Sequence, residues 1–188
     1  MLVVIDGLDA SGKSTQAEML AEHLKRLGKT YILRSHPSDD NFLGVKGREY
    51  LFIEGRKAHI AASLFYIADV IRSITLYAWR RVDYVIVVRY LLGTAYLPAP
   101  IHRLAYLFFA KTLPTRGSLI YLNVPPAEAY RRVVNNRVKA ERFETMDELT
   151  KTAKKARELV SDGRWMIVDG DRSIPEIHED ILRAAGVK

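Results

Sequence analysis

The residues of this chain best suited to chemistry form a glycine-rich loop that ends in lysine and serine. Residues 7–14 read Gly-Leu-Asp-Ala-Ser-Gly-Lys-Ser, which matches the phosphate-binding pattern G-x-x-x-x-G-K-[ST]. The glycines let successive backbone N–H groups point into one concavity, where negative charge is favourable. In such a loop (a P-loop) the lysine reaches the β- and γ-phosphates of a nucleoside triphosphate, and the serine hydroxyl binds Mg²⁺. We therefore predict a site for ATP and Mg²⁺ with Ser14 as the metal ligand; the residues expected to bind the nucleotide are Gly7, Asp9, Ala10, Ser11, Gly12, Lys13, Ser14 and Thr15.

Basic residues are concentrated in one later part of the chain. Residues 131–157 contain nine lysines and arginines against four acidic residues. Phosphoryl transfer needs fixed cations, because negative charge spreads over the oxygens of the transferred group. The Asn135-Asn136 pair interrupts the helical pattern, so we predict a lid over about residues 135–148 whose Arg137 and Arg142 contact the phosphates. Four later basic residues are expected on a solvated helix face; they are Lys151, Lys154, Lys155 and Arg157.

Short apolar runs alternate with helical patterns along the chain, and these elements must position the loop. The apolar runs are residues 2–6, 31–34, 84–88, 119–124 and 165–169. Helical patterns cover residues 14–27 and 58–80, and further helices are expected to begin near Pro126, Thr145 and Ser173. This alternation, without a linker or a low-complexity run, predicts one α/β domain over residues 1–188. Its core would be a five-stranded parallel sheet with helices on both faces.

Composition narrows the possible classes of protein. The chain has 188 residues, of which 48% are hydrophobic, and this excludes a disordered tail or a coiled-coil rod. It has no cysteine, so disulfides, thiolate zinc sites and a cysteine nucleophile are excluded. The 29 lysines and arginines outnumber the 22 acidic residues and give a net charge of +7. That excess favours an anionic partner: a nucleotide, a nucleic acid or a membrane surface.

The longest apolar stretch, residues 60–79, reaches membrane length. It carries Asp69 and Arg72 near its middle, and each would cost about 2.5–3.5 kcal/mol at the centre of a bilayer. Its apolar residues recur at helical spacing, which is typical of a core or interface helix. We therefore expect no membrane partner, a cytoplasmic location, and a homodimer formed through the helix at 58–80. Burial of this helix within one chain is the alternative.

Beyond the loop, short segments along the whole chain carry motifs in a defined order. They are D-G-L-D and G-K-S-T-Q at 6–9 and 12–16, L-G and R-E at 43–44 and 48–49, L-F-Y-I-A-D at 64–69, R-Y at 89–90, L-N-V-P-P at 122–126, E-R-F-E at 141–144, and V-D-G with S-I at 168–170 and 173–174. In this order they resemble the motifs of the thymidylate kinases, a family within the nucleoside monophosphate kinases. The resemblance implies a P-loop kinase fold with an arginine-bearing lid.

The resemblance also implies roles for the residues that would bind the phosphate acceptor. Asp9 would contact the sugar hydroxyl of the acceptor, and Arg48 and Arg89 would bind its phosphate. Tyr66 falls where an aromatic side chain stacks on the acceptor base. Tyr96 lies in G-T-A-Y-L, which resembles the family segment S-x-x-A-Y-Q. From the residues alone, Arg48 could instead be a surface helix residue and Tyr66 a core residue.

Three positions depart from the family pattern. The aspartate of the family's D-R-Y motif is Val88 here, so an acidic group near Mg²⁺ is missing, and Asp6 is the candidate to replace it through water. The third-helix arginine that reads thymine falls at Val70, and Leu97 replaces the polar end of S-x-x-A-Y-Q. Because specificity is built on such polar contacts, the identity of the acceptor base is left open.

We therefore predict a magnesium-dependent phosphotransferase that moves the γ-phosphoryl group of ATP to a nucleoside monophosphate, with dTMP, converted to dTDP, as the first expectation. The acceptor is already an ionised phosphate, so no general base is needed; the expected catalytic residues are Lys13, Arg89, Arg137 and Arg142. Two alternatives stay open, a P-loop kinase for another small acceptor and a nucleotide-binding relic without activity. No nucleic-acid partner is expected.

Overall fold

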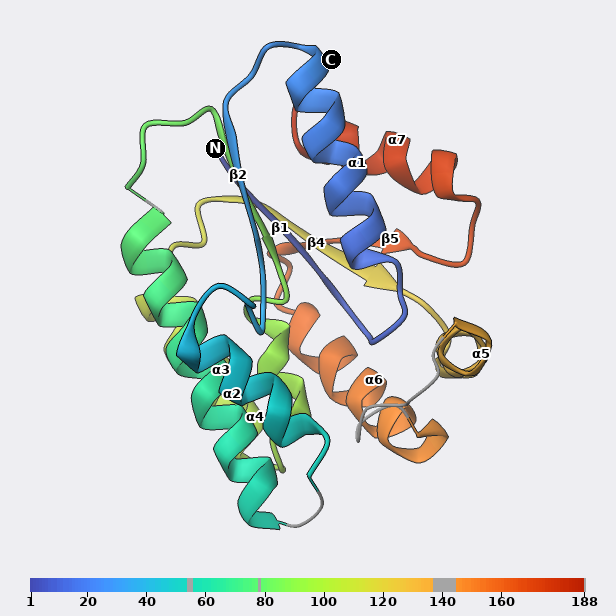
Figure 1. The fold of residues 1–188 in the computed structure, drawn as a ribbon. Coiled ribbons are helices and arrows are strands. Elements are labelled where there is room, and N and C mark those ends of the chain that lie inside the picture. Colours follow the sequence, from blue (N-terminus) through green and yellow to red (C-terminus); the bar gives the residue numbers. More distant parts are fainter. Residues whose placement is uncertain (54–55, 78, 137–144, 188) are drawn as a thin grey trace.

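The computed structural model describes residues 1–53, 56–77, 79–136 and 145–187. In this part of the chain, a sheet of five parallel strands is covered by helices on both faces (Figure 1), which confirms the predicted fold class. The strands are β1 (Leu2–Gly7), β2 (Tyr31–Ser35), β3 (Tyr84–Val88), β4 (Gly117–Asn123) and β5 (Trp165–Asp169), and their order in the sheet is β2-β3-β1-β4-β5. The predicted lid arginines, Arg137 and Arg142, lie outside the described residues.

Strand β1 lies in the middle of the sheet because both of its faces are apolar. Val3, Val4 and Ile5 are completely buried. Ile5 pairs with Val88 of β3 on one side and with Ile120 of β4 on the other, so the carboxyl ends of the three strands meet at one edge. Ligands of open α/β sheets bind at this edge, and the P-loop follows β1 there.

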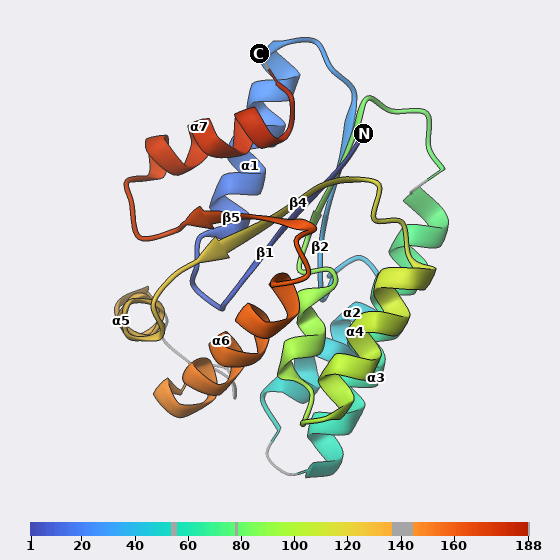
Figure 2. The same cartoon turned by 180° about the vertical axis from the view of Figure 1, so that it is seen from behind.

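The helices divide between the two faces of the sheet (Figure 2). Helices α1 (Lys13–Arg26) and α7 (Ile174–Ala184) cover one face, and α3 (Arg56–Tyr77), α4 (Ile101–Thr112) and α6 (Met146–Val160) cover the other. The helices predicted over residues 14–27 and 58–80 are thus present, although α1 begins one residue earlier and α3 ends three residues earlier than expected. Helix α5 (Pro126–Asn136) lies beyond the carboxyl end of β4 and packs on α6.

The expected helix starts are confirmed by their capping contacts. Pro126 is the first residue of α5. The Thr145 hydroxyl accepts a hydrogen bond from the Glu148 N–H at 3.4 Å, and the Ser173 N–H donates to the Glu176 carboxylate at 3.1 Å. These contacts satisfy N–H groups that a helix leaves unpaired at its start.

Helix α2 (Phe42–Leu51), the 3₁₀ helix η1 (Leu92–Tyr96) and α4 were not predicted from the sequence. Two glycines weaken the helical signal of α2, and the structure explains one of them. A Cβ on Gly44 would lie 2.0 Å from the Ser38 carbonyl oxygen, so the helix can approach this turn only with glycine. The Asn41 side chain caps α2 by accepting from the N–H groups of Leu43 and Gly44.

Helix α3 is held to the rest of the chain at its middle. Asp69 is fully buried and accepts hydrogen bonds from the Ser38 N–H at 2.7 Å and the Ser38 hydroxyl at 2.6 Å.

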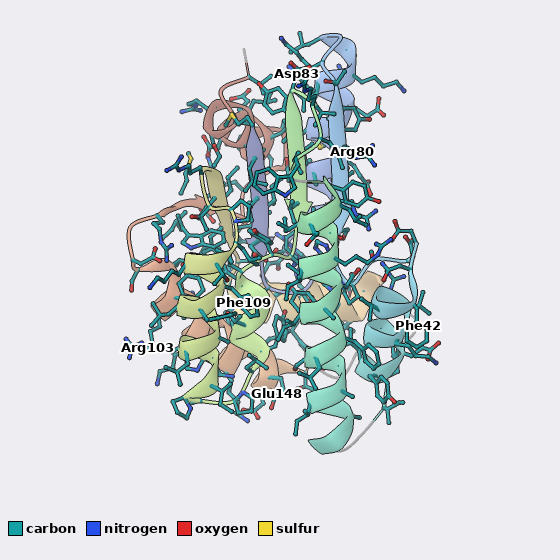
Figure 3. The ribbon with its side chains drawn as sticks, turned by 90° about the vertical axis from the view of Figure 1, so that its left-hand side faces the viewer. Phe42, Arg80, Asp83, Arg103, Phe109 and Glu148 are labelled. Carbon is teal, nitrogen blue, oxygen red and sulfur yellow. The ribbon has the colours of Figure 1, made fainter. Side chains whose placement is uncertain are left out.

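Helix α3 also has an apolar outer side. By length and composition alone, the Ile60–Tyr77 segment of α3 could cross a membrane, and 28% of that segment is buried in the protein. Beside it in Figure 3 lies α4. The two helices expose apolar side chains that we call the α3–α4 face; they are Ile60, Leu64, Ile71, Leu76, Ile101, Leu104, Leu107 and Phe108.

Candidate active site

The P-loop connects β1 to α1 and depends on close backbone packing. A Cβ on Gly7 would lie 2.6 Å from the Ser11 hydroxyl oxygen and 2.8 Å from the Leu122 carbonyl oxygen, so no larger residue fits there. Gly12 has a φ of 92°, a left-handed conformation that glycine adopts without strain. The buried Lys13 ammonium donates to the Leu8 carbonyl, which folds the side chain back over the loop. Ser14 is exposed in the first turn of α1.

A wide cleft opens over this loop, which we call the P-loop cleft. Its volume is about 1530 Å³, and it is lined by Ala10–Gln16, Arg89, Glu128, Arg131, Arg132, Asn135, Gly170, Arg172, Ile174 and Ile177. Six of the predicted nucleotide-binding residues, Ala10 to Thr15, therefore line one cleft. N–H groups at a helix start together with several cations favour a polyanion such as a triphosphate.

Three arginines of the P-loop cleft have no predicted role from the sequence: Arg131, Arg132 and Arg172. Arg132 donates through Nε to the Glu128 carboxylate at 2.6 Å and through Nη2 to the Gly170 carbonyl at 3.2 Å, so it joins α5 to the turn after β5. Arg131 donates to the same carboxylate at 2.6 Å. The two guanidinium groups lower the pKa of Glu128 to about 2. Arg131 and Arg132 stand in the basic stretch, but only the fold brings them beside the P-loop.

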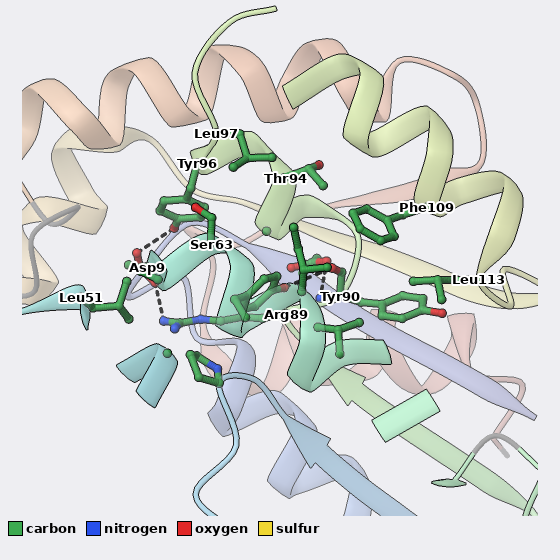
Figure 4. A pocket seen from close by; sticks show the side chains of 18 of the residues that line it. Asp9, Leu51, Ser63, Arg89, Tyr90, Thr94, Tyr96, Leu97, Phe109 and Leu113 are labelled. Carbon is green, nitrogen blue, oxygen red and sulfur yellow. Dashed lines mark hydrogen bonds and ion pairs between the residues drawn. The ribbon is translucent and has the colours of Figure 1, made fainter. Parts of the chain in front are cut away.

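A second cleft, which we call the α3 cleft, borders the start of the loop at Gly7 and Asp9 (Figure 4). It has about 860 Å³ of space and is lined by Asp6, Gly7, Asp9, Pro37, Gly47, Leu51, Ala62, Ser63, Tyr66, Ile67, Val70, Arg89, Tyr90, Gly93, Thr94, Tyr96, Leu97, Phe109 and Leu113. Gly7 and Asp9 were also expected to bind ATP, but they line the α3 cleft and not the P-loop cleft. Tyr66, Arg89 and Tyr96, expected to bind an acceptor, line it as well.

Arg89 lines both clefts and so lies where they meet. Its guanidinium forms an ion pair with the Asp9 carboxylate, and the Tyr96 hydroxyl donates to the other Asp9 oxygen at 2.7 Å (Figure 4). Burial raises the pKa of Tyr96 well above its usual value, so its hydroxyl keeps the proton that it donates. Arg89 has a φ of 58°, and such a left-handed backbone costs a non-glycine residue about 1–2 kcal/mol. Strain of this kind is concentrated at functional sites.

Arg48 lies beside the α3 cleft but is absent from its lining. The side chain is exposed, and its Nη2 donates to the Pro37 carbonyl at 2.9 Å. Pro37 and the neighbouring Gly47 and Leu51 do line the cleft. Arg48 thus lies at the rim of the α3 cleft, bound to the backbone carbonyl of Pro37. Its contact with an acceptor phosphate stays a prediction.

Tyr66 packs against the buried core, and its predicted stacking on an acceptor base stays a prediction. It lines the α3 cleft, and its hydroxyl donates to the Tyr90 carbonyl at 3.1 Å. A Cβ on Gly93 would lie 2.3 Å from the Tyr66 hydroxyl oxygen, so Gly93 lets η1 approach the ring. The ring is therefore a fixed wall of the cleft.

Asp6, the candidate to replace the aspartate missing at position 88, lies at the carboxyl end of β1 with one carboxylate oxygen bound to backbone N–H groups. Val88 is buried in the core, and the Asp6 carboxylate accepts from the Tyr90 N–H at 3.0 Å and from the Leu92 N–H at 3.1 Å. Burial raises the pKa of Asp6, and these hydrogen bonds oppose that rise. The described residues contain no group of three or more His, Asp or Glu arranged to hold a metal ion. Ser14 together with triphosphate oxygens fits a Mg²⁺ that arrives with its nucleotide.

The part of the α3 cleft farthest from the P-loop is apolar. Phe109 and Leu113 lie at this end in Figure 4, and Val70 packs with them in the core. Leu97 also lines the cleft, and its carbonyl accepts from the Lys155 ammonium at 2.8 Å. The prediction that Lys155 lies on a solvated face is wrong, because the side chain is half-buried and bound to this segment.

A P-loop at the carboxyl end of the central strand, with a second cleft that meets the first at one arginine, defines a P-loop kinase of the kind that phosphorylates a small acceptor. The sequence profile of thymidylate kinase matches residues 5–181. The chain therefore belongs to the thymidylate kinase family. It is accordingly an ATP-dependent phosphotransferase that converts dTMP to dTDP.

Individual relatives agree with this assignment over almost the whole chain. A probable thymidylate kinase of Thermococcus gammatolerans is 31% identical, with 97% of this chain and 94% of that protein aligned. A probable thymidylate kinase of Pyrococcus abyssi is 32% identical, with 96% and 93% aligned. The solved structure of thymidylate kinase from Candida albicans superimposes with a TM-score of 0.75 at 21% identity, over 97% of this chain and 89% of that one. At this identity the structural match supports the fold.

Proposed function

We propose that the chain binds ATP in the P-loop cleft and dTMP in the α3 cleft, and transfers the γ-phosphoryl group between them at Arg89. The observation that carries this proposal is that Arg89 lines both clefts. A guanidinium at their junction can contact the transferred group and the accepting phosphate, and it offsets charge that spreads over the phosphoryl oxygens during transfer.

On the donor side, the P-loop N–H groups and Lys13 would hold the triphosphate, and Arg131, Arg132 and Arg172 would add positive charge to the cleft. Ser14 would hold a Mg²⁺, which supplies neutralisation of the phosphate charge when bound. Arg137 and Arg142 stay as proposed lid residues on the evidence of the sequence motif alone, because they lie outside the described residues.

On the acceptor side, the polar end of the α3 cleft faces the P-loop. Asp9 would accept a hydrogen bond from the sugar hydroxyl of dTMP while it keeps Arg89 and Tyr96 in place. Arg89, and Arg48 at the rim, would bind the phosphate of dTMP. No general base is required, since the attacking oxygen already belongs to an ionised phosphate.

At the apolar end, the thymine base would lie against Tyr66, Val70 and Leu97. The Tyr66 hydroxyl already donates to a backbone carbonyl, and Val70 and Leu97 offer no hydrogen bond. We therefore propose that shape, more than hydrogen bonding, selects the base. A missing methyl group changes binding in an apolar pocket by about 1–3 kcal/mol, so dUMP would be a substrate about 10- to 200-fold poorer than dTMP.

The test is ADP release with ATP and Mg²⁺ across dTMP, dUMP, UMP, CMP, AMP and GMP. Turnover that is fastest with dTMP supports the proposal, and turnover with none of them overturns it. Lys13→Ala should abolish turnover while the melting temperature stays within a few degrees. Lys151→Ala, an exposed lysine that pairs with Asp147 and Glu148 on α6, is the matched control and should leave the rate unchanged.

We also propose that the protein is a cytoplasmic homodimer that associates through the α3–α4 face. Leu64, Leu104 and Phe108 are each more than 60% exposed, and contiguous apolar patches of this kind mark interfaces. The same patch accounts for the membrane-like composition of α3 without a membrane partner, and no nucleic-acid partner is proposed. Sedimentation of the wild type should give twice the chain mass, and Leu64→Asp should shift it toward the monomer; a monomeric wild type overturns this proposal.

A further inference from the structure

His36 is a buried histidine that no role assigned so far uses. It follows the end of β2, is 1% exposed, and its backbone N–H donates to the Val88 carbonyl at 3.1 Å. Its ring Nδ1 lies 3.1 Å from the Arg89 carbonyl oxygen. A carbonyl oxygen can only accept, so Nδ1 carries the proton and donates it. The ring thus holds the peptide group that follows the strained residue 89.

Two further side chains hold the peptide groups that come next. The Tyr66 hydroxyl donates to the Tyr90 carbonyl at 3.1 Å. The Asp6 carboxylate accepts from the Tyr90 and Leu92 N–H groups at 3.0 and 3.1 Å. These contacts come from three separate elements, β1, α3 and the turn after β2. Together they fix the turn that begins at Arg89.

The fixed turn decides where the Arg89 guanidinium lies. Residue 89 has a φ of 58°, and in this left-handed conformation its guanidinium pairs with Asp9. A non-glycine residue keeps such a conformation only where its surroundings over-determine it. Without the hydrogen bond to its carbonyl, residue 89 can relax toward an ordinary conformation, and the guanidinium would then leave the junction of the two clefts.

We propose that His36 is a positioning residue for phosphoryl transfer, which holds Arg89 in its left-handed conformation by donating a hydrogen bond from Nδ1 to the Arg89 carbonyl. The inference rests on the proposed function, in which Arg89 contacts the phosphates. Burial lowers the pKa of His36, which keeps the ring neutral near pH 7. A neutral imidazole has one N–H, and this N–H is committed to Arg89.

The test compares two substitutions in the full-length chain. His36→Phe fills the space but removes the donor, whereas His36→Asn places an amide N–H near the position of Nδ1. We expect His36→Phe to lower kcat/KM for dTMP at least fivefold and His36→Asn to recover it to within twofold of the wild type. His102 on α4 is also buried but lines neither cleft, so His102→Phe is the matched control and should stay within twofold. If His36→Phe does not fold, His36→Leu, which is smaller and also lacks a donor, takes its place and should show the same loss.

A double-mutant cycle separates positioning from general packing. If His36 acts through Arg89, adding His36→Phe to Arg89→Ala should change the affinity for dTMP, measured by calorimetry, less than twofold. Equal loss from His36→Phe in both backgrounds would overturn the proposal, and so would equal activity of the Phe and Asn variants. A wild type that is inactive with dTMP would instead refute the proposed function, so the two failures are distinguishable.

Discussion

Replacement of Asp9 by asparagine tests the link between the two clefts most directly. The Asp9 carboxylate, 3% exposed, pairs with the Arg89 guanidinium and accepts from the Tyr96 hydroxyl at 2.7 Å. The asparagine amide would keep the shape of the carboxylate but lose its charge, and its N–H group would face one of these two donors. A hydrogen bond to a charged group contributes about 1.5–3 kcal/mol, so Asp9→Asn should lower kcat/KM for dTMP by about 10- to 150-fold.

The assay is steady-state ADP release with dTMP and with 3′-deoxy-dTMP. If Asp9 also accepts from the sugar hydroxyl, removal of that hydroxyl should impair the wild type and have a smaller effect on Asp9→Asn. Asp162 is the matched control, because it also binds a tyrosine and an arginine but lies outside both clefts: Tyr106 donates to it at 2.7 Å and Arg164 at 2.8 Å. A rate for Asp9→Asn within twofold of the wild type, or an equal loss in Asp162→Asn, would refute this reasoning.

Three further predictions concern the parts that support the site. Asp69→Ala leaves the buried Ser38 N–H and hydroxyl without their acceptor, so the free energy of unfolding measured in urea should decrease by about 2–5 kcal/mol; an unchanged denaturation midpoint would contradict this. Gly93→Ala places a Cβ 2.3 Å from the Tyr66 hydroxyl and should raise KM for dTMP at least tenfold with little change in KM for ATP, which kinetics with each substrate varied in turn would show. The folded-state pKa of His36 is lowered by burial, so below about pH 6.5 the unfolded chain binds the extra proton and stability falls with pH. Melting curves should therefore show a larger loss between roughly pH 7 and pH 5 for the wild type than for His36→Phe, and parallel losses would refute the assignment.

The sequence was sufficient where the controlling interactions are local. The P-loop could be read from residues 7–14 because its glycines and its lysine act within one turn of the chain. The five strands could be read because each is an apolar run. In contrast, α2 was missed because glycine normally weakens a helix, and the reason for Gly44 is a carbonyl oxygen of another turn, which a Cβ would approach to 2.0 Å.

The two sides of the site show the same division between local and distant causes. Sequence motifs singled out Asp9, Arg89 and Tyr96, but their separation along the chain is 80 residues or more from Asp9, and only the sheet brings them into contact. The commitment of Lys155 to the Leu97 carbonyl, 58 residues away, could not be read from a charge run. His36 carried no signal of a role, because the carbonyl that it binds belongs to Arg89, 53 residues away along the chain.

By itself, then, the chain's order of residues determined the α/β layout, the phosphate-binding loop and the candidate arginines, because periodicity and loop chemistry depend on neighbours within a few positions. The tertiary structure decided which of those arginines lies between the clefts and that the Asp9 carboxylate binds it. It also decided which hydrogen bonds hold the turn at Arg89, the residue with the left-handed backbone. The reason is physical: the hydrogen bonds from β1, α3 and the turn after β2 to the turn at Arg89 form only once the strands are aligned edge to edge.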